Sequence, residues 1–155
     1  MLFEDTENSY NNWRGNWGEY DGWSVGGTKF LVVHGAVFRR NRSIGNHAFG
    51  FWFDTDCTDI LVDGAWWVEN DRAAIFIEAN QGPIAIRNSV MAFNDAGVTS
   101  TNSSRITLEN NLIYGNRTSQ IGLTGPRDRP IRTWNWGGTE KEIVTQIRDW
   151  TCLLY

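Results

Sequence analysis

Two acidic side chains occupy matching places in successive copies of one short sequence pattern. Asp54 ends the segment Gly50-Phe-Trp-Phe-Asp54, and Glu78 ends the segment Ala74-Ile-Phe-Ile-Glu78. Two carboxylates held one strand spacing apart, about 4.8 Å, raise one another's proton affinity, so one can serve as an acid while the other stays ionised. A separation of about 5 Å suits a retaining glycosidase better than an inverting one. We therefore predict Asp54 and Glu78 as a catalytic pair, with Asp56 in the next turn as a third catalytic carboxylate.

Other interpretations of these acids stay open. Asp54, Asp56, Glu78 and Asn80 carry the oxygen ligands that calcium prefers, so a calcium site is one alternative. An acidic ladder on a solvated sheet face is another. His47 precedes the Asp54 segment and is a candidate acid or base, although a histidine in a Gly/Asn-rich loop is more often plain surface. The sequence predicts no required cofactor and no dedicated metal site, with Ca²⁺ as the one ion these acids would suit.

Aromatic residues accompany the acids. Trp52 and Phe76 share the alternation of Asp54 and Glu78, so we expect them to face outward beside the carboxylates, as in a sugar subsite. The chain has nine Trp, and Trp13, Trp17 and Trp23 cluster in an Asn/Gly-rich stretch near the start. They are expected either to bind substrate or to cover an end of the fold.

The acids belong to a repeat. Ile60, Ile84 and Ile106 lie 24 and 22 residues apart and begin equivalent short segments. Self-similarity at a period of about 20–50 residues indicates a solenoid. The segments are β-branched or aromatic and are separated by Asn, Asp, Gly and Ser, which favours strands over helices. Asn70, Asn94 and Asn116 each close a copy, which predicts a hydrogen-bonded asparagine ladder.

The alternation within the copies predicts which side chains are buried. Ile75 and Ile77 are expected inside, and Phe76 and Glu78 outside. In the third copy, Ala96-Gly-Val-Thr-Ser100, the same alignment places Val98 and Ser100 outside.

An earlier, partial copy is expected over residues 29–41. Leu31 and Val33 would match Ile60 and Val62, and Asn41 would match Asn70. Residues 42–49 would then be an inserted loop.

The whole chain of 155 residues is predicted to form one all-β domain. Residues 1–28 are expected to be a Trp/Gly-rich loop region, residues 29–120 regular coils, and residues 121–155 a loop with a last partial coil. Within that last region, residues 120–123 are expected to form a strand, residues 124–138 a loop, residues 140–147 a short helix or a strand pair, and residues 149–155 another strand. This gives about four to five coils, and we expect them to be part of a longer β-helix.

The net charge of −4 and pI of about 5.1 argue against nucleic acid or an anionic membrane as the main partner. The acidic start lacks the pattern of a secretory signal. Cys57 and Cys152 fall in distant coils, so both are expected to be unpaired. We expect a monomer.

One segment carries a family resemblance. Asn110-Asn-Leu-Ile-Tyr-Gly-Asn116, preceded by Ile-Thr-Leu-Glu, resembles the right-handed parallel β-helix repeat of the pectate-lyase-like superfamily. Residues 51–56 and 75–80 resemble coils of its secreted bacterial carbohydrate-active members. The resemblance implies a right-handed parallel β-helix located outside the cell or in the periplasm, with a polysaccharide or oligosaccharide as partner.

For activity, the resemblance implies three alternatives. The first is a glycoside hydrolase that uses the carboxylate pair. The second is a polysaccharide lyase that acts on an acidic polymer with a basic residue and with calcium held by Asp54, Asp56 and Glu78. The basic residue would come from Lys29 or the cluster of Arg39, Arg40 and Arg42, of which Lys29 and Arg40 are the predicted substrate-binding residues. The third is a glycan-binding or structural β-helix module without chemistry.

Overall fold

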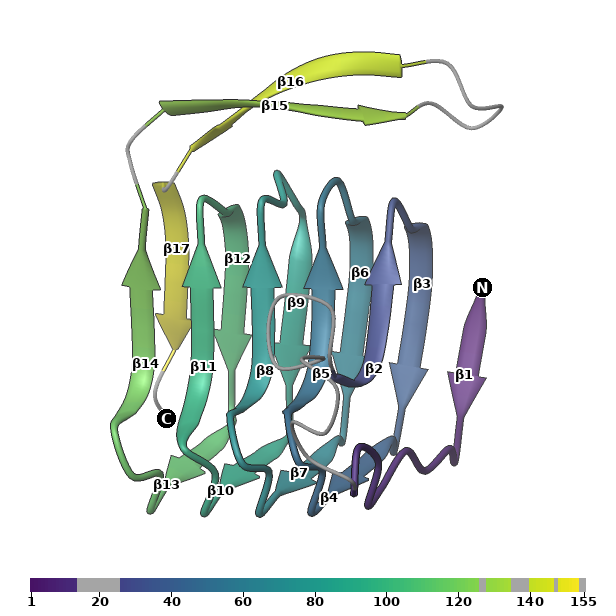
Figure 1. The fold of residues 1–155 in the computed structure, drawn as a ribbon, viewed down its shortest axis with the longest axis vertical. Helices are drawn as coiled ribbons and strands as arrows, with labels where there is room; N and C mark the ends of the chain where they lie inside the picture. The colour runs from purple at the N-terminus through teal and green to yellow at the C-terminus, as the bar shows by residue number, and fades with distance from the viewer. Residues whose placement is uncertain (14–25, 126–127, 135–139, 147, 154–155) are drawn as a thin grey trace.

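The chain winds into a parallel β-helix in which successive coils add strands to three sheets (Figure 1). The computed structural model describes residues 1–13, 26–125, 128–134, 140–146 and 148–153. These residues form seventeen strands. Among them there is no helix with the length and apolar character needed to cross a membrane.

The three sheets are the walls of the coil. The six-stranded sheet has the order β1 (Leu2–Glu4), β3 (His34–Arg39), β6 (Thr58–Asp63), β9 (Ile84–Arg87), β12 (Ser104–Glu109) and β17 (Arg148–Leu153). The five-stranded sheet has the order β14 (Ser119–Thr124), β11 (Ala96–Thr101), β8 (Ala73–Glu78), β5 (Phe49–Asp54) and β2 (Gly26–Leu31). The four-stranded sheet has the order β13 (Leu112–Tyr114), β10 (Val90–Ala92), β7 (Trp66–Val68) and β4 (Arg42–Ile44).

Every strand pair within these three sheets is parallel, because each strand bonds to its counterpart one coil later. An antiparallel hairpin of β15 (Asp128–Trp134) and β16 (Glu140–Gln146) interrupts the last coil. It crosses over the turns between the five-stranded and six-stranded sheets (Figure 1). The predicted strands at residues 120–123 and 149–155 correspond to β14 and β17. The hairpin replaces the loop expected at residues 124–138.

The core fills the inside of the coil, and its side chains change from aromatic to aliphatic along the coil axis. Phe38, Phe51 and Phe53 form a contacting aromatic group in the early coils, with ring centroids 5.2–5.5 Å apart. Aliphatic side chains replace them in later coils. Ile75 and Ile77 are fully buried, as the alternation predicts. Burying a side chain of this size stabilises a fold by roughly 1.5–3 kcal/mol.

An asparagine ladder holds the corner between the four-stranded and five-stranded sheets. The Asn70 backbone N–H and Nδ2 both donate to Oδ1 of Asn94, at 2.9 and 2.8 Å. Asn94 donates in the same way to Asn116, at 3.0 and 3.1 Å. The predicted ladder is therefore confirmed, and Asn46 extends it by one coil through its bonds to Asn70.

The third copy has a different register from the one predicted. Val98 pairs with Ile75, and Ser100 pairs with Ile77, so Val98 and Ser100 point into the core. The prediction that they face outward is wrong, because Ala96 aligns with Ala73 rather than with the adjacent alanine. A shift of one residue moves every side chain of a strand to the opposite face.

The earliest copy is also displaced from its predicted position. Ala36 and Phe38, rather than Leu31 and Val33, pair with Ile60 and Val62. Asn46 rather than Asn41 occupies the ladder position. Residues 42–49 are consequently not an inserted loop: they contain β4, the ladder corner and the start of β5.

Candidate functional site

The outer face of the five-stranded sheet carries the predicted acids. Two columns of side chains run across it, because pairing brings equivalent residues of successive coils together. One column contains Lys29, Trp52, Phe76, Thr99 and Gly122. The other contains Leu31, Asp54, Glu78, Thr101 and Thr124.

Asp54 is held by neighbours on both carboxylate oxygens. Lys29 Nζ lies 2.8 Å from Oδ2 of Asp54. The backbone N–H and Oγ1 of Thr55 donate to Oδ1, at 2.7 and 2.9 Å. Asp54 is also only 9% exposed. Its charge is therefore compensated and its lone pairs are largely occupied, an arrangement that suits a structural or positioning carboxylate better than a proton donor.

Glu78 lies beside this group. It is half-buried at the end of β8, in the register position next to Asp54. The structure thus brings Asp54 and Glu78 to adjacent strands of one face, while their catalytic role stays a prediction.

Asp56 lies at the corner and not on the sheet face. It occupies the turn after β5 with a φ of 61°, and its Oδ2 is 2.6 Å from Lys141 Nζ and 3.5 Å from His34 Nε2. Asn80 points inward: its Oδ1 accepts from the Cys57 N–H and its Nδ2 donates to the Phe53 carbonyl. The calcium cage considered from sequence therefore does not assemble. Among the residues described, no three His, Cys, Asp or Glu side chains form a metal-holding group.

Trp52 faces outward as predicted but is not exposed. Only 1% of it is accessible, because neighbouring side chains cover the ring. Lys29 Nζ lies 3.7 Å from the ring centroid, and the rings of Phe49 and Phe76 are 5.3 and 5.1 Å away. The prediction of an exposed Trp52 platform is therefore wrong. Phe76 is half-buried and stacks on Phe49 at 4.8 Å.

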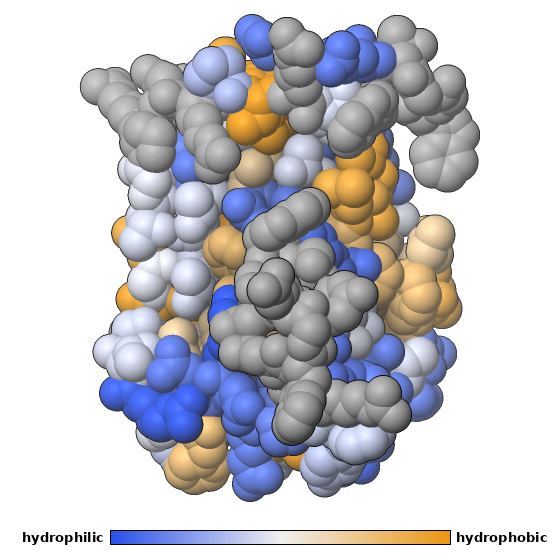
Figure 2. All heavy atoms as spheres, in the orientation of Figure 1, coloured by the Kyte–Doolittle hydropathy of each residue, from blue (hydrophilic) through white to orange (hydrophobic). Residues whose placement is uncertain are grey.

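A groove lies beside this aromatic group, and the sequence did not predict it. The side chains of the outward column become smaller along the coil axis, from Phe76 to Thr99 to Gly122. The surface is therefore hollowed over β11 and β14. The groove is open and has a volume of about 420 Å³. Figure 2 shows weakly polar atoms on this part of the face.

The lining of the groove combines one aromatic wall with charged and hydroxyl groups. It includes Phe49, Arg72, Asp95, Thr99, Thr118 and Gly122. The Arg72 guanidinium lies 5.3 Å from the Phe49 ring centroid. Asp95 Oδ1 is 3.5 Å from Arg117 Nε, and the Asp95 carbonyl accepts from Thr118 Oγ1 at 2.9 Å.

The remaining predicted site residues do not converge on the acids. His47 is exposed and pairs with Asp71, its Nδ1 lying 2.9 Å from Oδ2, at the asparagine-ladder corner. Arg40 makes a two-point hydrogen bond to Asp5, at 2.7 and 2.8 Å, after the end of β3 in a different wall. Trp13 is exposed. Trp17 and Trp23 lie outside the described residues.

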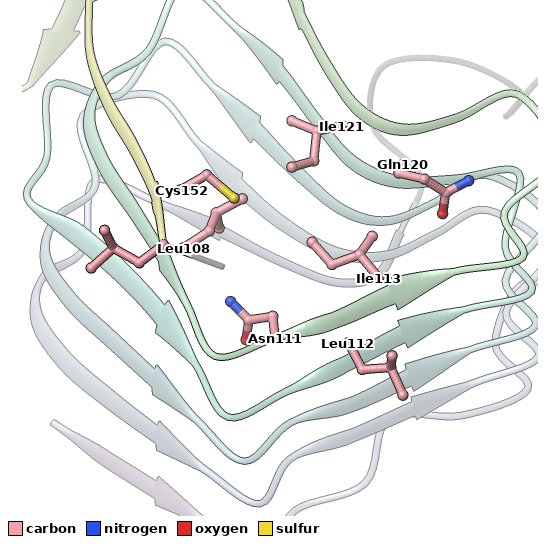
Figure 3. A pocket seen from close by; sticks show the side chains of 8 residues that line it. Leu108, Asn111, Leu112, Ile113, Gln120, Ile121 and Cys152 are labelled. Carbon is pink, nitrogen blue, oxygen red and sulfur yellow. The ribbon is translucent and has the colours of Figure 1, made fainter. Parts of the chain in front are cut away.

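A second cavity opens where the last coil ends. It has a volume of about 340 Å³ and is lined mainly by apolar side chains, among them Leu108, Ile113, Ile121 and Cys152 (Figure 3). These groups continue the interior columns of the coil, because Ile113 pairs with Met91, Ile121 with Val98 and Cys152 with Leu108. Cys57 and Cys152 are both unpaired, as predicted.

Residues 4–143 match the family described as "Periplasmic copper-binding protein (NosD)". The chain belongs to the NosD family. No curated protein sequence matches it.

One solved structure shares the fold of this NosD-family chain. It is the A-module of the mannuronan C-5 epimerase AlgE6 of Azotobacter vinelandii, with a TM-score of 0.59 and 18% identity. The match covers 63% of this chain and 29% of the epimerase module. This likeness confirms the right-handed parallel β-helix.

The family description raises the question of copper. Copper sites use imidazole, thiolate and thioether ligands. The described part of this chain contains two histidines, two cysteines and two methionines: His34, His47, Cys57, Cys152, Met1 and Met91. Met91 is fully buried in the core. The two histidines pair with different acids at different corners. Burial raises the pKa of the Cys57 thiol to about 12, so this thiol stays protonated at neutral pH and is a poor ligand. The described residues therefore do not fit a copper centre.

Proposed function

We propose that this chain is a polysaccharide-binding β-helix module, with the groove over β11 and β14 as its glycan site. The tapering column from Phe76 to Gly122 carries this proposal, because it creates a hollow with an aromatic wall and a hydroxyl-bearing floor. Sugar rings have apolar C–H faces and polar rims, so they match a surface that combines Phe49 with Thr99 and Thr118.

Charged side chains near the groove determine whether it prefers an acidic or a neutral glycan. Arg72 stands beside the aromatic wall, where its guanidinium can meet a carboxylate. The AlgE6 module, which shares this fold, is named for mannuronan. We therefore propose an acidic polysaccharide as the ligand. The family description supports a periplasmic location for this binding.

A glycoside hydrolase is the second candidate. The observation that favours it is the register, which puts Asp54 and Glu78 on neighbouring strands of the same face. Against it stands the ion pair between Lys29 and Asp54, which neutralises one member of the pair. Binding without chemistry is therefore the better-supported function.

Titration of the protein with neutral and uronic-acid oligosaccharides, followed by calorimetry, tests the binding proposal. Thr99→Arg fills the groove and is expected to weaken binding about tenfold or more. Thr107→Arg is the matched control, because Thr107 is a half-buried, outward threonine on β12 in the six-stranded sheet. Equal affinity of the two variants would exclude the groove.

Product analysis separates the two candidates. The native chain and the Asp54→Asn and Glu78→Gln variants are each incubated with the oligosaccharide that binds. We expect the sugar to stay intact in every case. Cleavage by the native chain that both substitutions abolish would establish the hydrolase instead.

A further inference from the structure

The connection from β14 to β17 differs from the equivalent turn of every earlier coil. Elsewhere the chain passes from the five-stranded to the six-stranded sheet through two to five residues. Here residues 125–147 intervene and contain the β15–β16 hairpin. The hairpin lies across the strand ends of the five-stranded sheet (Figure 1).

The hairpin has an inner and an outer face. Cross-strand pairing places Ile131 opposite Ile143, and Thr133 opposite Lys141. Thr133 and Thr145 on this face are fully buried, whereas the alternate residues Pro130, Glu140, Glu142 and Val144 are exposed. This alternation shows one face turned toward the coil and one toward solvent.

An ion pair fastens the inner face to a distant turn. Lys141 Nζ lies 2.6 Å from Asp56 Oδ2, although Asp56 belongs to the turn between β5 and β6, three coils before the hairpin. Asp56 is 6% exposed, and His34 Nε2 also approaches it. In the docked hairpin, removing the Lys141 cation leaves the buried Asp56 charge without this partner, so such a substitution is expected to destabilise docking.

The hairpin depends on docking for its order. A two-stranded hairpin standing alone is marginally stable in water, and β15 and β16 pair only with each other. We propose that β15–β16 is a strap that closes the strand-end side of the glycan face, latched by the ion pair between Lys141 and Asp56. The closing role rests on the proposed glycan-binding function, whereas the latch does not.

Amide hydrogen exchange of the full chain, read by mass spectrometry, tests the latch. Asp56→Asn keeps the side-chain shape and tolerates the φ of 61°, and Lys141→Met removes the cation from the other side. Both are expected to speed exchange of hairpin amides about tenfold or more, while β5, β8 and β11 stay protected. Asp59→Asn is the matched control, because Asp59 is an exposed aspartate with a φ of 55° near the start of β6, three residues after Asp56.

The outcomes decide both parts of the proposal. The latch is overturned if the hairpin amides of Lys141→Met exchange at the native rate while the coils stay protected. This result is conclusive even if Asp56→Asn also loosens the turn that contains residue 56. For the closing role, Lys141→Met is expected to raise the association rate constant of a groove-binding oligosaccharide about threefold or more. An unchanged rate constant overturns the closing role. Absence of any glycan binding removes the proposed function and the closing role, while the exchange result still stands for the latch.

Discussion

Replacing Asn94 with alanine tests whether the asparagine ladder holds the coils together. Asn94 is fully buried and its backbone is not in the left-handed region, so alanine introduces no backbone strain. The substitution removes Oδ1, which accepts from both the backbone N–H and Nδ2 of Asn70. It also removes Nδ2, which donates to the Trp67 carbonyl at 3.1 Å.

The magnitude follows from the groups left behind. Each buried polar group that loses its partner costs about 1–3 kcal/mol. The Asn70 N–H loses its acceptor and the Trp67 carbonyl loses a donor, whereas Asn70 Nδ2 keeps its bond to the Ser43 carbonyl. Two such groups give an expected loss of roughly 2–6 kcal/mol. That is a large part of the roughly 5–15 kcal/mol by which most domains are stable.

Urea unfolding followed by circular dichroism measures this loss. Asn88→Gly is the control, because Asn88 is exposed with a φ of 53° that glycine adopts readily. Its Nδ2 bond to Asp63 is on the surface, so we expect a change of less than about 1 kcal/mol. A loss below about 1 kcal/mol for Asn94→Ala would refute the view that the ladder bonds are essential.

Three further outcomes are expected. Phe53→Ala, at a fully buried site, is expected to cost about 3–5 kcal/mol in urea unfolding, and a loss under about 1 kcal/mol would contradict the aromatic core. Hydrogen bonds from Arg87 hold the pKa of Asp63 below its usual value. The ionised Asp63 carboxylate therefore stabilises the fold fully above its unfolded pKa of about 3.9, and this contribution is lost as pH falls through the lower folded pKa. The stability difference between the native chain and Asp63→Asn should therefore shrink with acidification; a difference that grows would reverse the sign. At pH 8 a thiol reagent should label exposed Cys152 alone in the native chain, because burial raises the pKa of Cys57 to about 12; rapid double labelling would argue against a buried Cys57.

The repeat was readable from the sequence where the residue types are restricted by structure. The asparagine amide supplies both the acceptor and the donors of the ladder on a short side chain, so Asn70, Asn94 and Asn116 mark the same corner in each coil. Aliphatic residues at alternate positions, such as Ile75 and Ile77, identify the inside of the strands for the same reason.

The sequence does not define the register where neighbouring residues offer equivalent alignments. Ala73 and Ala74 are both alanine, so Ala96 aligns with either one, and the wrong choice reverses the faces of the third copy. The burial of Trp52 depends on contacts with Lys29 and Phe49, which lie on another coil or at another position of the face. Such contacts depend on how strands of different coils are aligned, so they cannot be predicted from the spacing of residues within one strand.

The groove is also not evident from the sequence. Trp52, Asp54 and Glu78 stand out because they are large or charged. The groove arises instead from small residues, because Thr99 and Gly122 continue the column that Phe76 occupies.

In a parallel β-helix the inward columns and corner ladders are constrained by packing, whereas the outward columns are free to differ between coils. Binding specificity is therefore expected in the outward residues that change from coil to coil. Along the five-stranded sheet that change runs from a compensated acid, Asp54 with Lys29, through Phe76 to the open threonine surface at Thr99. Neither Asp54 nor Glu78 lines the groove. This geometry favours a module that holds a glycan at Thr99 and Gly122 over one that cleaves it between the two carboxylates.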